Sequence, residues 1–321
     1  MPAKDPIICA IGDVHGHLQL GLCVAARRQR ELGVSFDAVL LCGDVGSFTD
    51  DAQLDNATRR HGRRNPCELE FLHQWAADPQ PEWLQAIFQP SSSGGLGLLC
   101  PVVMVHGNHE GFDHLRSLLP GGPAATDADM RDLPAVDSGG HIRWLPSGWK
   151  ARTPSGLIVA GAGGIEKGQR EADYDELAYI DEGATLDLGL GGRVDVLVTH
   201  QGPSSIQGES VGSRALDDLL EEEIARIWFH GHSVAHPEIR RGGPRPGTLV
   251  VPLHDIAFAG RGPKARDPGE DGWCWARLGE EITVERERPA FWRKYRSHLW
   301  RRTAGGGLIC PDLVGAIPRG A

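Results

Sequence analysis

Gly107-Asn108-His109-Glu110 follows the apolar run Val102-Val103-Met104-Val105, and this stretch carries most of the information about the fold. The same order, a short apolar run that ends at a polar motif, recurs along the chain. The other motifs are Asp13-Val14-His15, Gly43-Asp44, Thr199-His200 and Gly231-His232. Short apolar runs that are bounded by glycine and alternate with helix-like stretches are typical of buried strands in an α/β sheet. We therefore expect an α/β fold in which these motifs meet at the carboxyl edge of the strands.

The side chains expected at that edge suit a pair of metal ions. They comprise two carboxylates, an amide and several imidazoles, a mixed oxygen and nitrogen set that suits Mn, Fe, Zn or Ni. In Asp13-Val14-His15 the alternate residues of a strand end point the same way, so both can reach one ion. The carboxylate of Asp44 has two oxygens and can bridge two ions roughly 3.5–4 Å apart. The pattern predicts a two-metal site that clamps a phosphate.

The order of the motifs resembles that of the calcineurin-like metallophosphoesterase superfamily, over roughly residues 6 to 260. Within the superfamily, the layout is most similar to the RNA lariat debranching enzymes. The similarity lies in the Gly107–Glu110 loop, a glycine-rich strand pair at 156–165 and the segment 195–203. The resemblance implies an α/β fold of the four-layer αββα sandwich type.

The domain organisation expected from this resemblance is one metallophosphoesterase domain at residues 1–285 with additions. Residues 46–98 separate two motifs by more than one connecting helix needs, so they form a helical insertion, as a cap or as an outer helix. Residues 286–321 interleave arginines with aromatic residues and are expected to form a C-terminal helix and tail. This composition favours either nucleic-acid binding or a terminal helix docked on the sheet.

Carried over position by position, the resemblance implies roles for the individual residues. One ion would be held by Asp13, His15 and Asp44, and the other by Asp44, Asn108, His200 and His232. A hydroxide between the two divalent ions (Mn, Fe, Zn, Ni or Mg) would attack phosphorus. His109 would protonate the leaving oxygen as general acid, with Asp13 supporting its charge.

The chain departs from the resemblance at two positions. Debranching enzymes typically carry cysteine where this chain has Asp13. Many superfamily members have a second histidine in Gly-His-x-His, and here that position is Val234. The nearby candidates for the missing ligand are His230, His236 and His254, each of which is otherwise a packing residue.

The function expected is hydrolysis of a phosphoester, preferably a phosphodiester or a nucleotide. Protein serine/threonine phosphatases have Asp-Arg-Gly just after Gly-Asp, and here Gly43-Asp44 continues as Val45-Gly46-Ser47. That branch, and phosphomonoesterases generally, are the less favoured alternatives. A metal-binding scaffold of low activity is a further alternative, but such a scaffold has no need of His109.

Candidate substrate contacts lie near the first and second motifs. His17 opens the first expected helix beside the site and is either a substrate contact or a helix-start residue. Arg59, Arg60, Arg63 and Arg64 lie close together in the insertion. Their guanidinium groups match phosphate geometry, which favours contact with substrate. An exposed charged helix without such a contact is an equally favoured interpretation.

Composition and charge limit the class of protein. The chain has 321 residues and a net charge of −10, which argues against a broad electrostatic dependence on nucleic acid. Its seven cysteines lack a C-x-x-C pattern, so we expect reduced thiols. No apolar stretch approaches the roughly 18 residues of a membrane span. We expect a cytoplasmic protein with a phosphoester substrate, a nucleotide or nucleic acid among the candidates.

Overall fold

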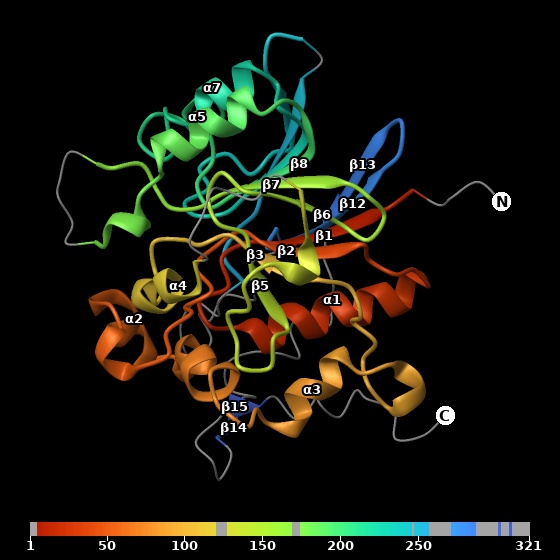
Figure 1. Cartoon of the computed structure of the whole chain (residues 1–321), viewed down its shortest axis with the longest axis vertical. Coiled ribbons are helices and arrows are strands. Elements are labelled where there is room, and N and C mark those ends of the chain that lie inside the picture. Colours follow the sequence, from red (N-terminus) through yellow and green to blue (C-terminus); the bar gives the residue numbers. More distant parts are fainter. Residues whose placement is uncertain are drawn as a thin grey trace, which may run out of the picture.

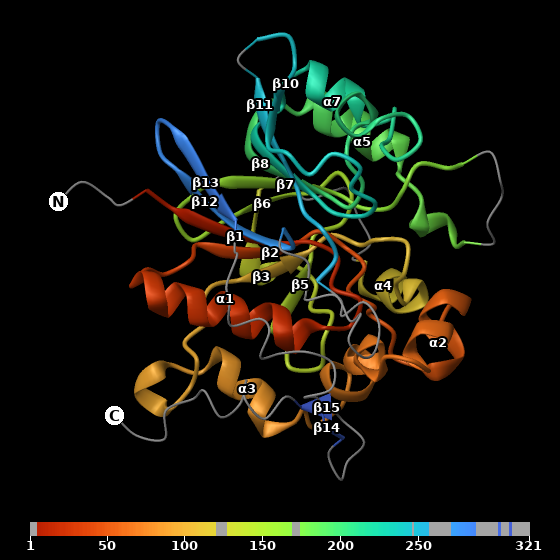
Figure 2. The same ribbon diagram turned by 180° about the vertical axis from the view of Figure 1, so that it is seen from behind.

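The computed structural model describes residues 5–119, 127–168, 174–245, 247–256 and 271–286, and the short strands at 301–302 and 308–309. Two β-sheets pack face to face within this part of the chain. Helices cover the outer face of each sheet, so four layers follow one another (Figures 1 and 2). This is the αββα sandwich that the sequence predicts.

The first sheet has the strand order β13-β12-β1-β2-β3-β5. Its strands are β1 (Ile7–Ile11), β2 (Ala38–Leu41), β3 (Val102–Met104), β5 (Ile142–Trp144), β12 (Trp273–Leu278) and β13 (Ile282–Arg286). β1, β2, β3 and β5 are parallel, and the β12–β13 hairpin adds to β1 in the antiparallel sense.

The second sheet has the order β10-β11-β9-β8-β7-β6-β4. Its strands are β4 (Ala128–Asp129), β6 (Lys150–Arg152), β7 (Ile158–Ala162), β8 (Val194–Thr199), β9 (Ala225–His230), β10 (Arg240–Gly242) and β11 (Thr248–Pro252). The four strands β7, β8, β9 and β11 are parallel neighbours.

The alternation of side chains along the strands explains the layers. Successive residues of a strand point to opposite faces. In β1, Ile8 and Ala10 face the second sheet, and Ile7, Cys9 and Ile11 belong to the core under the helices. Apolar side chains are therefore needed on both faces, which is why the central strands are continuous apolar runs.

The helices complete the outer layers. α1 (Leu18–Leu32) and α3 (Glu82–Phe88) cover the first sheet, and α5 (Glu182–Leu190) and α7 (Asp217–Glu221) cover the second (Figure 1). α2 (Asn56–Gly62) and α4 (Phe112–Leu118) lie together at one end of the sandwich (Figures 1 and 2). The remaining helical turns are η1 (Asp51–Gln53), η2 (Pro66–Leu69), η3 (Phe71–Trp75), η4 (Ser91–Ser93), η5 (Met130–Asp132), η6 (Glu176–Ala178) and α6 (Ser204–Gln207).

Two details differ from the sequence-based expectation. The glycine-rich segment 156–165 contributes one strand, β7, which pairs with β6 rather than within the segment. In the expected C-terminal helix, the described residues form the strands β14 (Arg301–Arg302) and β15 (Leu308–Ile309) instead. The rest of 287–321 lies outside the described residues.

The described part of the chain bears on two further expectations. None of its helices combines the length and the apolar character that crossing a bilayer requires. Six of its cysteines are free thiols, as expected, and Cys310 lies outside the described residues.

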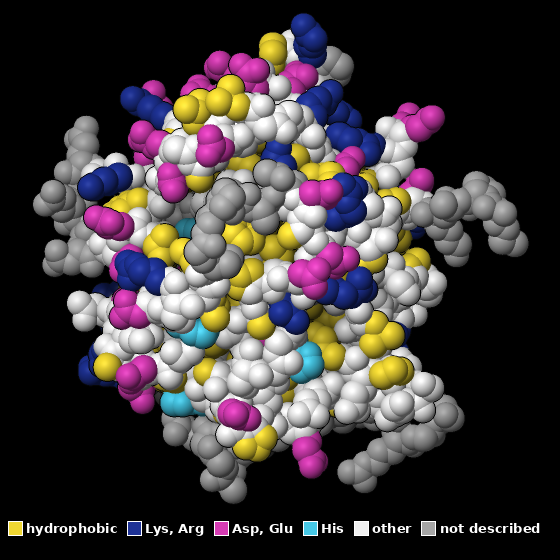
Figure 3. Space-filling view, in the orientation of Figure 1, with side chains coloured by type: hydrophobic (Ala, Val, Ile, Leu, Met, Phe, Trp, Pro, Cys, Tyr) yellow, Lys and Arg dark blue, Asp and Glu magenta, His cyan; other side chains and the backbone are white. Residues whose placement is uncertain are grey.

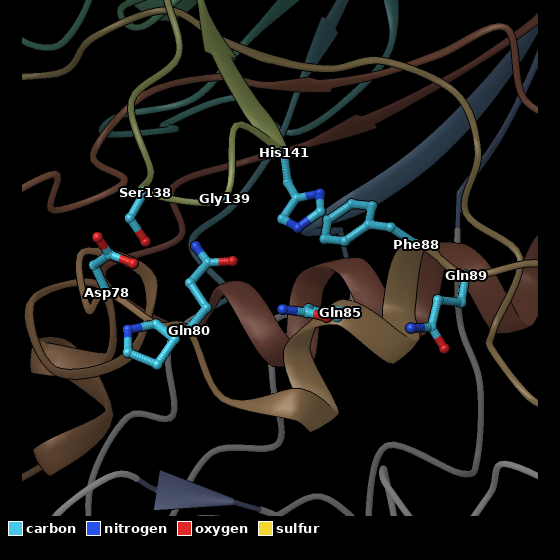
Figure 4. Close-up of a pocket in the computed structure, with 9 residues that line it drawn as sticks. Asp78, Gln80, Gln85, Phe88, Gln89, Ser138, Gly139 and His141 are labelled. Carbon is cyan, nitrogen blue, oxygen red and sulfur yellow. The ribbon is translucent and has the colours of Figure 1, made fainter.

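A cavity of about 430 Å³ lies between the insertion and the segment that leads into β5. Its lining includes Gln80, Phe88 and His141, and the rings of Phe88 and His141 stack with their centroids 4.1 Å apart (Figure 4). Gln80 donates hydrogen bonds to the Trp75 carbonyl and the Asp137 carboxylate. The cavity contains none of the predicted metal ligands and marks where the insertion is fastened to the sheet.

Candidate metal centre

The strand ends bring the predicted ligands together. Ligand atoms of Asp13, Asp44, His200 and His232 all lie within 4.8 Å of one another. Asp13 follows β1, Asp44 follows β2, His200 follows β8 and His232 follows β9, so both sheets contribute to one cluster. His15, beside Asp44, and Asn108, beside His200, complete the predicted set.

Asp44 has the geometry of a bridging carboxylate. Its Oδ1 lies 3.5 Å from Nε2 of His200, and its Oδ2 lies 3.7 Å from Nε2 of His15. Ligand atoms that share an ion at about 2.1 Å are about 3.0–3.4 Å apart in octahedral or tetrahedral geometry. The two oxygens of Asp44 therefore face two separate groups of ligands, at distances close to those of bound ligands.

The group around His200 contains lone pairs that face one another. Nδ1 of His200 lies 2.8 Å from the Cys42 carbonyl, and burial lowers the pKa of His200, so the neutral ring donates its one proton there. Nε2 then has a lone pair, although the Asn108 Oδ1 lies only 3.1 Å away. Three acceptor atoms from His200, Asn108 and Asp44 thus converge, an arrangement that a cation stabilises.

The carboxylates concentrate negative charge in a buried space. Asp13 is 4% and Asp44 2% exposed. Burial and the neighbouring Asp44 raise the pKa of Asp13 well above its usual range. Burial opposes ionisation of Asp44 as well, but the surrounding histidines, among which His15 has a raised pKa, outweigh it and hold the pKa of Asp44 below its usual range. The donor set therefore fits divalent cations.

The backbone at the ligands is strained and closely packed. His15, Asp44 and His232 have positive φ angles of 41°, 46° and 59°, a conformation that costs non-glycine residues of order 1–3 kcal/mol. The main-chain amide of His232 donates to Asp13 Oδ1 at 2.7 Å, which holds one of these turns. A Cβ on Gly107 would lie 2.1 Å from Asp44 Oδ1, so glycine is required beside that ligand.

His109 is paired with a carboxylate that the sequence analysis missed. Its Nδ1 lies 2.9 Å from Oδ2 of Asp55, and burial is outweighed by Asp55 and Asp44, which raise the pKa of His109. The sequence analysis expected Asp13 to support the charge of His109, and the structure places Asp55 there instead. Asp55 also accepts from the amide of Thr58 and begins α2. This partner depends on how the insertion folds, which no local pattern reveals.

Glu110 ties two ligand loops together. Its buried carboxylate accepts hydrogen bonds from the amides of Val45 and Ser47 and from the Ser47 hydroxyl, each at 2.8 Å. Burial and the neighbouring Asp44 raise the pKa of Glu110 to about 7. The motif therefore ends in a residue that positions the Asp44 loop rather than one that binds an ion.

Tyr174 lies beside the same loop. Its ring is edge-on to His109 with centroids 6.0 Å apart, and its hydroxyl is hydrogen-bonded to the Asn108 side chain. An Asn108 amide held at its nitrogen keeps Oδ1 turned toward His200. An isolated tyrosine in an acidic loop carries no sequence signal for such a contact.

His17 lies inside the protein and has no exposed surface. Its Nδ1 lies near the carbonyls of Val14 and His15, and the Asn65 amide lies 3.0 Å from its Nε2. Burial lowers its pKa to about 4. These contacts join the His15 turn to the insertion, and the burial of the ring does not support the predicted substrate contact.

The insertion arginines lie on α2 and just after it, near the metal centre. Arg59 donates to the carbonyls of Asp51 and Leu54 within the insertion. Arg60, Arg63 and Arg64 are exposed. Contact between these guanidinium groups and a substrate stays a prediction.

Among the described residues, none of the three candidates for the ligand missing at Val234 belongs to the cluster of ligand atoms. His230 is fully buried, with Nδ1 near the Gly231 carbonyl and its ring against Gly202, and burial lowers its pKa to about 4. His236 is exposed and its amide donates to Gln207. His254 donates its amide to the Asp271 carbonyl.

The fold and the candidate centre are typical of one class of protein, hydrolases in which two facing sheets present a metal site at their strand ends. Residues 7–236 match the model of the calcineurin-like phosphoesterase family, and the chain belongs to this family. Membership implies a metal-dependent phosphoester hydrolase. No curated protein matches the chain.

Replacing Glu110 tests its structural role. Glu110→Gln leaves the amides of Val45 and Ser47 facing an amide NH₂ group, and an unsatisfied buried donor costs about 1–3 kcal/mol. We expect the free energy of unfolding of the metal-free protein to fall by this amount in urea titrations. Glu82→Gln, at an exposed site on α3, is the matched control. Equal stability of the two variants would contradict the role assigned to Glu110.

Replacing Asp55 tests its pairing with His109. A general acid works while protonated, so activity falls as pH rises through its pKa. Asp55→Asn removes the carboxylate that raises this pKa, so we expect the alkaline limb of the kcat profile to move to lower pH. We also expect kcat to fall by about tenfold or more. The upper limit of the loss is the factor of about 10²–10⁴ that acid catalysis contributes. Asp51→Asn, on the exposed turn η1, is the control. An unshifted alkaline limb would exclude the pairing.

Proposed function

We propose that the protein is a two-metal phosphoesterase that prefers a phosphodiester or a nucleotide. The observation that carries this proposal is the arrangement around Asp44. Its two oxygens face His15 on one side and His200 on the other, and the same loop presents His109 paired with Asp55. Ligands for two ions and a proton donor thus lie on one rim.

Each group of residues has a defined task in this proposal. Asp13, His15 and Asp44 would hold one ion, and Asp44, Asn108, His200 and His232 the other. When bound, two such ions lower the pKa of bound water and neutralise charge on a phosphate. His109 would hold a proton at Nε2, because Nδ1 is engaged with Asp55, and would deliver it to the leaving oxygen.

The charges around the centre favour a diester over a monoester. A diester carries one negative charge, whereas a monoester dianion carries two and usually needs a fixed guanidinium group. The charged neighbours that act most strongly on His15 are the carboxylates Asp255, Asp44, Glu68 and Asp13. This negative surrounding makes a dianion costly to bind, and it disfavours a protein phosphatase.

The active-site contacts also weigh against a low-activity scaffold. A scaffold needs the ligands of the ions but not a proton donor. His109 is nevertheless oriented by Asp55, by the ring of Tyr174 and by its own amide, which donates to Asp44 Oδ1 at 2.8 Å. These contacts support turnover.

The substrate we propose is a small diester or nucleotide rather than a long nucleic acid. Tyr174 lies next to the proton donor, so an aromatic base on the leaving group would meet its ring. On the face shown in Figure 3, basic side chains are scattered among acidic ones rather than gathered into a field. A debranching activity on RNA is the finer alternative suggested by the layout of the motifs.

The substrate preference is tested with synthetic esters. We expect an aryl phosphodiester to have a kcat/KM about tenfold or more above that of the aryl phosphomonoester, equivalent to roughly 1.4 kcal/mol. The assay is run with Mn, Ni, Zn, Fe and Mg in turn, followed by cyclic nucleotides, dinucleotides and branched RNA. Metal-stripped protein is the control. Hydrolysis of the monoester alone would overturn the diester preference.

The roles of His109 and Asp44 are separated by metal analysis. We expect His109→Asn to lower kcat by about 10²–10⁴ while two ions per chain remain bound. Asp44→Asn removes the bridging charge and should lose metal as well as activity. Elemental analysis of the two purified variants alongside turnover decides the point. Equal metal loss in both variants would remove His109 from the acid role.

A further inference from the structure

The side of the centre around His15 has fewer assigned ligands than the other side. Asp13, His15 and Asp44 serve one ion, whereas four residues serve the second. The imidazole that many relatives supply two residues after His232 is replaced by Val234. The structure brings another segment to this place, the turn that follows β11.

The turn after β11 runs beside the strand ends that carry the ligands. β11 is parallel to β9, with Pro252 opposite His230, and the amide of Leu253 donates to the His230 carbonyl at 2.8 Å. The turn therefore continues alongside Gly231 and His232.

Both neighbours of Asp255 are in contact with the end of β1. The amide of Ile256 donates to the Asp13 carbonyl at 2.9 Å. On the other side, the His254 carbonyl is so close to Gly12 that a Cβ there would lie 2.2 Å from the oxygen. The backbone thus fixes Asp255 between two contacts with Gly12-Asp13, and its side chain is exposed rather than packed in the core.

The charge of Asp255 acts directly on the centre. Burial lowers the pKa of His15, but carboxylates raise it to about 10, and Asp255 contributes more than Asp44, whose Oδ2 lies 3.7 Å away. Asp255 also contributes to the raised pKa of Asp13, after burial and Asp44. The backbone contacts of its two neighbours with Gly12 and Asp13 place Asp255 beside the end of β1, next to the loop that carries Asp13 and His15. Glu68 acts on His15 less strongly.

We propose that Asp255 is a ligand of the ion held by Asp13, His15 and Asp44, and that it supplies a carboxylate where Val234 lacks an imidazole. This inference rests on the two-ion assignment of the proposed function. A carboxylate oxygen is a harder ligand than an imidazole nitrogen, in the sense of hard and soft acids and bases. The first site should therefore favour Mn²⁺ or Mg²⁺ over Zn²⁺ more strongly than a site with two imidazoles.

Calorimetric titration of metal-free protein with Mn²⁺ tests the ligand. We expect Asp255→Asn to weaken one of two binding steps by about 100-fold or more and to leave the other within about threefold, since outer partners alone typically contribute 10–100-fold. Glu68→Gln is the adjacent control, and Asp187→Asn, exposed on α5, is the distant one. Thermal melting without metal confirms that each variant folds. Two unchanged steps in Asp255→Asn would overturn the proposal.

A spectroscopic test asks whether residue 255 touches the ion. In Asp255→Cys loaded with Co²⁺, direct coordination creates a sulfur-to-cobalt charge-transfer band that wild type and Asp187→Cys lack. The native thiols are the same in wild type, so a band that appears only in Asp255→Cys comes from residue 255. Bound Co²⁺ without the band would show that Asp255 acts from a distance, which contradicts the proposal.

Neither measurement depends on turnover, so the two conclusions can fail separately. Wild-type protein that binds two ions, loses one in Asp255→Asn and hydrolyses no phosphoester would refute the proposed function and leave this ligand assigned. If wild-type protein hydrolyses a diester and Asp255→Asn keeps both ions, the proposed function stands and Asp255 is not a ligand.

Discussion

Mutual repulsion among buried acceptor atoms is the constraint on which the rest of the structure depends. Asp13 and Asp44 are almost fully buried, and the lone pair of His200 faces two further oxygens. Buried charge is costly unless it is paired. The main-chain amides of His232 and His109 donate to Asp13 and Asp44, and burial keeps the nearby imidazoles of His200 and His232 neutral. Divalent cations would resolve this repulsion, and the scaffold must hold the acceptors together without them.

Packing between the two sheets holds these acceptor atoms together. Apolar side chains from the inner faces of both sheets form one buried core, among them Ile8, Leu40, Val198 and Phe229. Because strands from both sheets end at the cluster, the packing between the sheets fixes the separation of Asp44 and His200. The amide of Gly231 donates to the His200 carbonyl at 2.9 Å, and Glu110 spans the two loops of the first sheet. The stability of the apolar core thus offsets the backbone strain and the electrostatic repulsion at the candidate metal centre.

The sequence predicted what local patterns encode. Apolar runs that end at glycine located the strands, and the order of the motifs located the ligands, because a strand end fixes its next residues within a few ångströms. It did not predict partners that arise from long-range packing. Asp55 lies 54 residues from His109, and only the folded insertion brings them together. A histidine next to a metal motif, such as His17, looks the same in sequence whether it faces substrate or core. The helix spacing at 286–321 was equally misleading at Arg301–Arg302, where pairing with Leu308–Ile309 decides the conformation.

The contacts of residues 46–98 show how closely this insertion is connected to the candidate metal centre. A detachable cap would contact substrate and leave the metal centre intact when removed. Here Asp55 pairs with His109, the proton donor that we propose, and Asn65 contacts the ring of His17 behind the His15 turn. The Glu70 carboxylate accepts a hydrogen bond from the main-chain amide of Gln19 at 2.7 Å, which fastens the first turn of α1 to the insertion at a second point. The segment 46–98 thus contacts the residues around the candidate metal centre and also presents exposed arginines. A change in the packing of this segment would therefore move groups at the candidate metal centre, because Asp55 and Asn65 link the two directly.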